Sequence, residues 1–114
     1  MEQKTEPMEI FSYGHTYKVR PNLTSYMFGG GLCIELICAD AEDYGEPFGN
    51  LTVNLAGKQC DPDEAYVDTN NIPTAGGFIR RYNLGHTTGE TAQSGFCFYP
   101  KYKFNIEELK KYAV

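Results

Sequence analysis

The sequence contains no tryptophan and no apolar run long enough to cross a membrane. A membrane helix needs about 20 consecutive apolar residues, and no stretch of this chain approaches that length. The chain starts with MEQKTEPMEIF, which lacks the basic segment followed by a hydrophobic one that marks a secretory signal. These absences predict a soluble protein of the cytoplasm.

Cysteine is also sparse, and no two cysteines are spaced as Cys-x-x-Cys. Without that spacing, neither a zinc ribbon nor a thioredoxin-like redox pair is supported. Free thiols in a reducing compartment are the simplest interpretation of Cys33, Cys38, Cys60 and Cys97. We therefore expect no structural metal and no cofactor.

Few residues are suited to catalysis. Only His15 and His86 are available as a general base, and no nucleophile motif such as Gly-x-Ser-x-Gly lies near either of them. The acidic residues fall in hydrophilic turns, where nothing sets two carboxylates apart for acid and base roles. We expect a protein that is not an enzyme, and a pairing of Cys97 with His86 stays open as the catalytic alternative.

A calcium loop is the remaining metal site to consider. Asp40, Glu42 and Gly45 match positions one, three and six of the EF-hand pattern. Position five is Tyr44 and position twelve is Leu51, so carboxylates are missing where coordination needs them. We expect no EF-hand in this segment.

With 114 residues the chain has the length of one domain, and its apolar content of 41% is typical of a globular protein. Residues 1–7 are polar and end in Pro7, which predicts a flexible terminus before ordered structure begins at Met8. We expect a single domain over residues 1–114.

The strongest pattern lies in residues 32–55, where the apolar runs LCIELICA and NLTVNL flank the acidic loop DAEDYGEPFG. Leu32, Ile34, Leu36 and Cys38 share one face of a strand, and Leu51, Val53 and Leu55 share one face of another. This pattern predicts a long β-hairpin with a central first strand and a negatively charged tip.

The remaining segments predict further short strands and one helix. A hairpin is expected around Gly14, and Pro21 is expected to end its second strand or to confine it to an edge. Gly29, Gly30 and Gly31 favour a turn between strands. Further expected strands cover residues 23–28, 65–69, 78–84 and 96–104, the last interrupted at Pro100, and residues 85–95 are expected to form an exposed loop.

Asn105 and Glu108 form a helix N-cap pattern, with the two residues as partners in a capping box, so a helix should follow Asn105. The fold class predicted from all these segments is α+β, mainly antiparallel β-sheet with about seven short strands and a C-terminal α-helix.

The net charge of −5 is distributed unevenly. Residues 35–68 hold nine acidic residues against Lys58 alone, residues 69–114 carry a net charge of +3, and residues 1–34 are neutral. An acidic segment of this kind can imitate the phosphate backbone that basic DNA-binding grooves recognise. The residues expected to contact such a groove are Asp40, Glu42, Asp43, Glu46, Asp61, Asp63 and Glu64.

The basic C-terminal third supports an alternative function, direct binding of nucleic acid. Arg80, Arg81, Lys101 and Lys103 would form a basic rim around a platform of aromatic rings that stack on bases. The aromatic residues of that platform would be Phe96, Phe98, Tyr99, Tyr102 and Phe104.

Residues 32–71 include Gly45-Glu46-Pro47 and Leu51-Thr52-Val53-Asn54-Leu55. With these motifs, the segment resembles a family of small uncharacterised domains encoded on plasmids and conjugative elements of Gram-positive gut bacteria. Tyr44 departs from the Asp-Gly-Glu-Pro pattern of that family. The resemblance implies an accessory protein of a mobile genetic element and supplies no catalytic residues.

Charge and resemblance together predict a non-enzymatic acidic binding protein, an anti-CRISPR or anti-restriction inhibitor that acts as a DNA mimic. Its expected partner is the basic DNA-binding groove of a host-defence nuclease or surveillance complex. The alternative is a nucleic-acid-binding accessory factor of plasmid or conjugative transfer that uses the basic C-terminal third.

Overall fold

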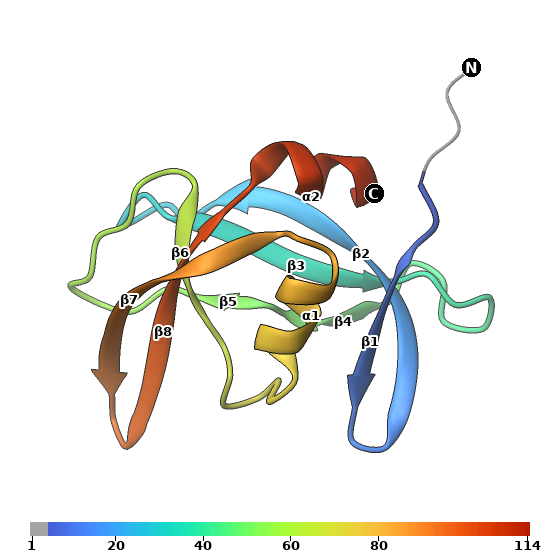
Figure 1. Cartoon of the computed structure of the whole chain (residues 1–114), viewed down its shortest axis with the longest axis horizontal. Coiled ribbons are helices and arrows are strands. Elements are labelled where there is room, and N and C mark those ends of the chain that lie inside the picture. Colours follow the sequence, from blue (N-terminus) through green and yellow to red (C-terminus); the bar gives the residue numbers. More distant parts are fainter. Residues whose placement is uncertain (1–4) are drawn as a thin grey trace.

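Residues 5–114 are described by a computed structural model, in which eight strands form two antiparallel sheets and two short helices flank them (Figure 1). The flexible terminus expected for residues 1–7 falls in part on residues 1–4, which lie outside the described residues. The first sheet has the strand order β1(Met8–Ser12), β2(His15–Ser25), β3(Leu32–Cys38), β4(Pro47–Asn50). The second has the order β5(Thr52–Val53), β6(Glu64–Val67), β8(Cys97–Phe104), β7(Gly85–Ser94). With helices α1(Ala75–Arg81) and α2(Ile106–Tyr112), this confirms the predicted α+β class and its C-terminal helix.

The hairpin expected around Gly14 is formed by β1 and β2. Tyr13 and Gly14 connect the strands with φ values of 50° and 78°, the left-handed pair that suits the twist of a two-residue hairpin turn. None of the helices in residues 5–114 is long and apolar enough to cross a membrane.

Pro21 lies inside β2, so the expectation that it ends the strand was wrong. Its carbonyl accepts a hydrogen bond from the Val114 N–H at 3.1 Å, which shows that its backbone polar groups face away from β3. On the side of β2 away from β3, strand β1 does not reach Pro21, because the first residue of β1, Met8, pairs with Val19. Proline therefore costs no ladder bond here, and the separate strand expected over residues 23–28 is instead the end of β2 and the turn that follows it.

The glycine run forms the expected turn between strands. The Tyr26 N–H donates to the Gly31 carbonyl at 2.9 Å, and Gly29 has a φ of 85°. A Cβ atom on Gly29 would lie 2.9 Å from the Lys58 carbonyl oxygen, so the close approach of this loop also requires glycine.

Strand β3 is central and has the predicted faces. Leu32, Ile34, Leu36 and Cys38 are buried and alternate with half-buried residues, and β2 and β4 pair with β3 on its two sides. Its partner in the hairpin differs from the prediction, because β4 consists mostly of residues that were assigned to the acidic loop, with Asn50 from the run NLTVNL.

The run NLTVNL leaves the first sheet for the second at Leu51 and Thr52. Both residues are fully buried, so the alternation expected for Leu51, Val53 and Leu55 was wrong. The Leu51 N–H donates to the Ile34 carbonyl at 2.9 Å, and the Thr52 hydroxyl accepts from the Ile34 N–H at 3.1 Å. These two bonds join the end of one sheet to the start of the other.

The structure differs from the prediction in two consecutive segments. The strand expected over residues 78–84 is mostly helix α1, which buries Ala75, Phe78 and Ile79 at the helical spacing of three and four residues. The loop expected over residues 85–95 is mainly β7, whose side chains are nearly all exposed. Strand β8 is continuous through Pro100, which pairs with Thr91 beside a register shift in β7, so the expected interruption was wrong.

Helix α2 begins at the predicted cap. The Asn105 Oδ1 atom accepts from the Glu108 N–H at 3.3 Å. The reciprocal half of the capping box is absent, because the Asn105 N–H donates to the Leu84 carbonyl and the Glu108 carboxylate lies 2.7 Å from Lys111 Nζ. Asn105 thus ties the start of α2 to the residue that precedes β7 as well as capping the helix.

Replacing Asn105 with alanine should lower the free energy of unfolding by about 0.5–2 kcal/mol, because the Glu108 N–H loses its acceptor. Urea denaturation followed by circular dichroism measures this change. A loss of stability in Asn105→Ala that Asn105→Asp does not share would assign the effect to the cap, and equal losses in the two variants would contradict it.

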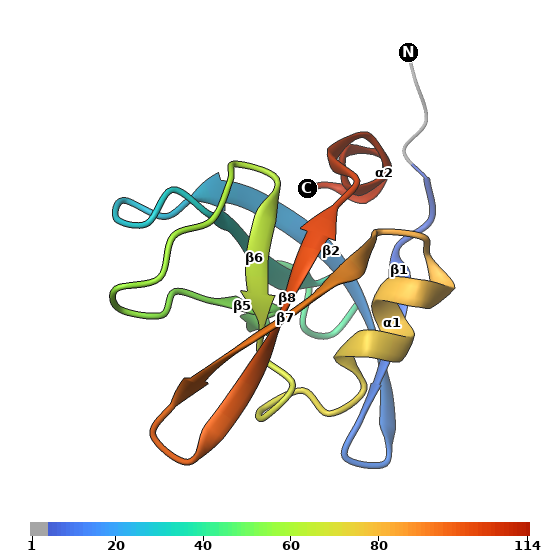
Figure 2. The ribbon, with the colours of Figure 1, turned by 60° about the vertical axis from the view of Figure 1, so that its left-hand side comes forward.

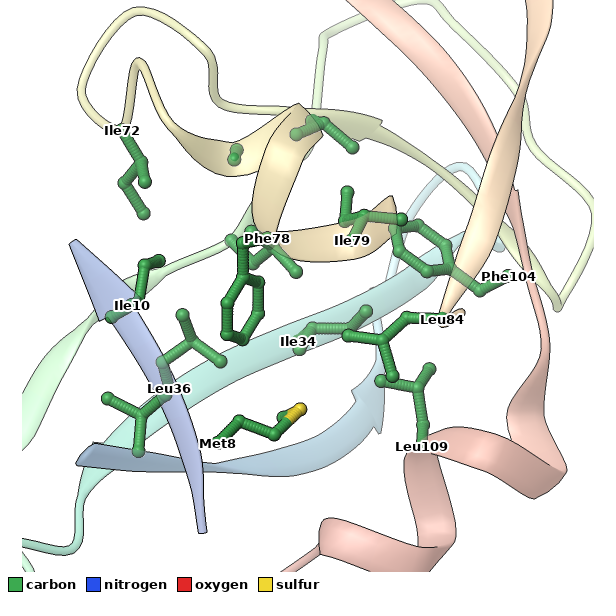
Figure 3. Packing of buried hydrophobic residues seen from close by; sticks show 14 of the residues in the cluster. Met8, Ile10, Ile34, Leu36, Ile72, Phe78, Ile79, Leu84, Phe104 and Leu109 are labelled. Atoms are coloured by element: carbon green, nitrogen blue, oxygen red, sulfur yellow. The ribbon is translucent and has the colours of Figure 1, made fainter. Parts of the chain in front are cut away.

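The core lies between the first sheet, α1 and the helix α2 (Figure 3). In a second view α1 lies beside β1, and α2 follows directly from the end of β8 (Figure 2). The labelled core side chains are Met8, Ile10, Ile34, Leu36, Ile72, Phe78, Ile79, Leu84, Phe104 and Leu109. The core thus takes side chains from both sheets and both helices.

Candidate functional site

The turn between β3 and β4, residues 39–46, carries four carboxylates and no basic residue, and we call it the acidic turn. Its conformation is fixed by the Cys38 N–H, which donates to the Glu46 carbonyl at 2.7 Å, and by the Gly45 N–H, which donates to the Cys38 carbonyl at 2.9 Å. Asp40 anchors the turn to β2, because its carboxylate accepts from the Lys18 N–H at 3.0 Å.

The four carboxylates of the acidic turn form no ion pair within residues 5–114. Glu42, Asp43 and Glu46 are exposed, and Asp40 is half-buried. Tyr44, which lies between Asp43 and Glu46 in the sequence, is 76% exposed. The turn therefore presents four uncompensated negative charges and one aromatic side chain to solvent.

A groove of about 450 Å³ lies beside the acidic turn. Ile37, Cys38 and Tyr44 contribute to its wall, and Arg20 closes it, with its guanidinium donating to the carbonyls of Tyr112 and Thr5 at 3.1 and 2.6 Å. Burial raises the pKa of the Cys38 thiol above its ordinary value, and the charges of the acidic turn raise it further. The thiol therefore stays protonated and is a poor nucleophile.

The other predicted contact residues, Asp61, Asp63 and Glu64, lie at the opposite end of β3. The Cys60 N–H donates to the Gly29 carbonyl at 2.9 Å, which places this segment beside the turn that precedes β3 (Figure 1). A strand of this length spans about 20 Å. The structure therefore separates the seven predicted acidic residues into two groups.

Lysines of β8 neutralise much of the second group. Lys103 Nζ lies 3.0 Å from the Asp63 carboxylate, and Lys101 Nζ lies 3.5 Å from the Glu64 carboxylate and 3.3 Å from that of Glu90. The hydrogen bond with Asp63 raises the pKa of Lys103. Part of the predicted acidic set is thus paired with part of the predicted basic set.

The aromatic platform expected for nucleic-acid binding is also divided. Phe104 is buried in the core and Tyr102 packs against it, whereas Phe96 and Phe98 are exposed near the tip of the β7–β8 hairpin. Tyr99 is half-buried. Position along β8 separates the rings that the sequence places together, because the strand runs from the exposed tip of the hairpin into the core.

Arg80 and Arg81 lie on helix α1. Arg80 is exposed, and Arg81 Nη2 lies 3.1 Å from the Glu9 carboxylate, with its guanidinium 5.0 Å from the Tyr82 ring centroid. With Lys101 and Lys103 held by acidic partners, three of the four predicted basic residues have an acidic partner.

The proposed pairing of Cys97 with His86 is not assembled. Cys97 pairs with Ser94 at the tip of the hairpin, whereas His86 pairs with Lys103 at its base. The four cysteines are unpaired, and no three His, Cys, Asp or Glu side chains within residues 5–114 converge to hold a metal ion.

Tyr26 contacts the junction between the two sheets. Its hydroxyl lies 2.9 Å from the Thr52 hydroxyl, and burial, the largest cause, raises its pKa from 10.0 to about 12.

Absorbance at 295 nm should therefore show one tyrosine that ionises near pH 12 and is missing in Tyr26→Phe. The unfolded chain loses this proton near pH 10 while the folded chain retains it, so the stability from Tyr26 is complete below pH 10 and declines towards pH 12. Titration of every tyrosine near pH 10 would contradict the burial of the Tyr26 hydroxyl.

A family model described as a domain of unknown function (DUF4313) matches residues 21–114. The match includes the acidic turn, the second sheet and both helices, and it excludes β1 and the first half of β2. No curated protein and no solved structure matches the chain.

Proposed function

Because the chain belongs to the family described as a domain of unknown function (DUF4313), we propose its function from its own surface. It is a non-enzymatic binding protein whose acidic turn docks on a basic DNA-binding groove of a partner and takes the place of the DNA backbone. The observation that carries this proposal is the group of four carboxylates without ion pairs on a turn of fixed conformation.

The fixed conformation supports tight binding, because little freedom is left to lose when the partner is bound. Clustered charge of one sign accelerates encounter with an oppositely charged groove. Tyr44 adds an exposed aromatic ring, a residue type that often dominates binding energy at interfaces. The contact set of this proposal is Asp40, Glu42, Asp43 and Glu46. Asp61, Asp63 and Glu64 are left out because they lie at the opposite end of β3, and Asp63 and Glu64 already have lysine partners.

The partner class in this proposal is a host-defence nuclease or surveillance complex, and the resulting activity is anti-CRISPR or anti-restriction inhibition. The mobile-element setting implied by the resemblance of residues 32–71 supports this choice. Such complexes hold DNA in positively charged channels that recognise the backbone.

Capture experiments with the purified chain test the proposal. The protein retained from a bacterial lysate should itself bind duplex DNA, and its binding to the chain should weaken at least about tenfold between 50 and 200 mM salt. The chain alone should shift neither single-stranded nor duplex DNA in a gel. A retained partner without DNA affinity, or a direct shift of DNA by the chain, would contradict the proposal.

A further inference from the structure

A second concave site lies at the end of the core nearest the β1–β2 turn. This pocket of about 360 Å³ lies between the first sheet and the segment that joins β6 to α1. The Thr74 hydroxyl donates to the Phe11 carbonyl and so ties that segment to β1. The pocket is lined by residues that include Ser12, Tyr13, Tyr17, Phe48, Asp68 and Asn71.

Asp68 contributes a buried carboxylate that has no cation. The residue is only 6% exposed, and its two carboxylate oxygens accept from the Asn71 N–H at 3.1 Å and the Asn71 Nδ2 at 2.8 Å. No lysine or arginine of residues 5–114 lies within ion-pair distance. Buried carboxylates are usually paired with a cation, and this one retains lone pairs for further donors.

Ser12 contributes a second polar group without a partner. Its residue is also 6% exposed, and its hydroxyl forms no hydrogen bond within the part of the chain that the structure describes. Within residues 5–114, every fully buried side-chain nitrogen or oxygen atom has a hydrogen-bond partner, so the Ser12 hydroxyl, which has none, is not fully buried. Because Ser12 lines the pocket, its hydroxyl opens on the pocket. Ser12 and Asp68 therefore both offer acceptors to a donor placed in the pocket.

Aromatic rings form the rest of the wall. The centroids of Tyr17 and Phe48 lie 5.0 Å apart with an interplanar angle of 60°, and Tyr13 is an exposed residue of the lining whose hydroxyl lies 3.4 Å from the Asn71 carbonyl oxygen. Aromatic faces attract organic cations through their negative quadrupole.

We propose that this pocket binds an organic cation, with an alkylammonium or guanidinium group against Asp68 and Ser12 and its alkyl part along Tyr17 and Phe48. The chemistry is complementary at each point: a carboxylate without a counter-ion faces the charge, a hydroxyl accepts a donor, and aromatic walls cover the methylene groups. This site differs from the acidic turn and does not depend on the function proposed for it.

Two-dimensional NMR with n-butylammonium and n-butylguanidinium tests this site. Both probes should shift the backbone resonances of Phe48, Asp68 and Asn71 in a saturable way, whereas the neutral n-butanol and the anionic butyrate should not. Equal shifts with n-butanol would overturn the proposal, and so would the absence of saturable shifts with both cations.

Variants assign the binding to named side chains. Asp68→Asn should weaken binding of n-butylammonium at least about tenfold, because it removes the only buried negative charge of the pocket. Since this change also alters the bonds to Asn71, Ser12→Ala and Phe48→Leu provide second tests and should each weaken binding about threefold or more with a native spectrum. Unchanged affinity in all natively folded variants would overturn the proposal.

The cation can come from a free amine or from a lysine or arginine side chain of a protein. Blocked tripeptides Gly-Lys-Gly and Gly-Arg-Gly separate these sources, because tighter binding of the peptides than of the free amines indicates a partner side chain and the reverse indicates a small molecule. Reversing the charges of Glu42, Asp43 and Glu46 should leave the affinity for n-butylammonium within about twofold, since those exposed charges are screened by salt.

Discussion

Replacing Thr52 with valine should lower the free energy of unfolding by about 2–4 kcal/mol. Valine has nearly the same shape as threonine but lacks the hydroxyl that accepts from the Ile34 N–H and bonds to the Tyr26 hydroxyl. Thr52 is 1% exposed, so water cannot replace the lost acceptor for Ile34. Urea denaturation followed by circular dichroism measures the change.

Thr52→Ser is the matched control, because it retains the hydroxyl and loses only a methyl group. It should cost about 1 kcal/mol. If the serine variant proves as unstable as the valine variant, the hydroxyl does not join the two sheets, and packing of the methyl group accounts for the stability instead.

Reversing three charges of the acidic turn should weaken binding to the partner at least about 100-fold. The variant carries Glu42→Lys, Asp43→Lys and Glu46→Lys, and it leaves Asp40 in place because that carboxylate bonds to the Lys18 N–H. All three side chains are exposed and without ion pairs, so the melting temperature should change by no more than a few degrees. Isothermal titration calorimetry with the captured partner measures the affinity.

A variant with Asp61→Lys, Glu90→Lys and Glu107→Lys has the same net charge at three exposed sites outside the acidic turn. Its affinity should stay within about fivefold of the wild type at physiological salt, because charges more than about 10 Å from the interface are screened. An equal loss in both variants would mean that net charge, and not the acidic turn, determines binding.

The sequence predicted the elements that carry a complete local signal. Strand β3 alternates apolar side chains along its whole length, Gly14 supplies a turn residue for the first hairpin, and Asn105 supplies the cap of α2. In each case the residues that determine the element lie within it or directly beside it, so the chain itself contains the information.

The predictions for three segments were wrong because the structure of these segments depends on distant residues. NLTVNL has the alternation of one strand, but the chain changes sheets at Leu51 and buries two neighbours in succession. Helix α1 contains Gly76 and Gly77, which are poor helix formers, and it forms because Phe78 and Ile79 fill the core. Strand β7 is exposed on both faces, so it shows no hydrophobic period to detect.

The candidate site shows the same division. A charge count along the chain located the acidic turn, since its carboxylates are neighbours in sequence. It could not show that Lys103 reaches Asp63, because that contact depends on the antiparallel register of β6 and β8. The charge count also included Asp68 in the acidic segment 35–68, whereas in the structure Asp68 is buried and lines a pocket.

Duplex DNA titrated into the complex of the chain with its partner gives the most direct test of whether the acidic turn takes the place of DNA. With a fluorescent label on the N-terminal amine, the apparent dissociation constant of the chain for its partner can be followed as DNA is added. It should rise in proportion to the DNA concentration once that concentration exceeds the dissociation constant of the partner for DNA, as competition for one groove requires. An apparent constant that stays unchanged at saturating DNA, with a ternary complex on a sizing column, would contradict DNA mimicry.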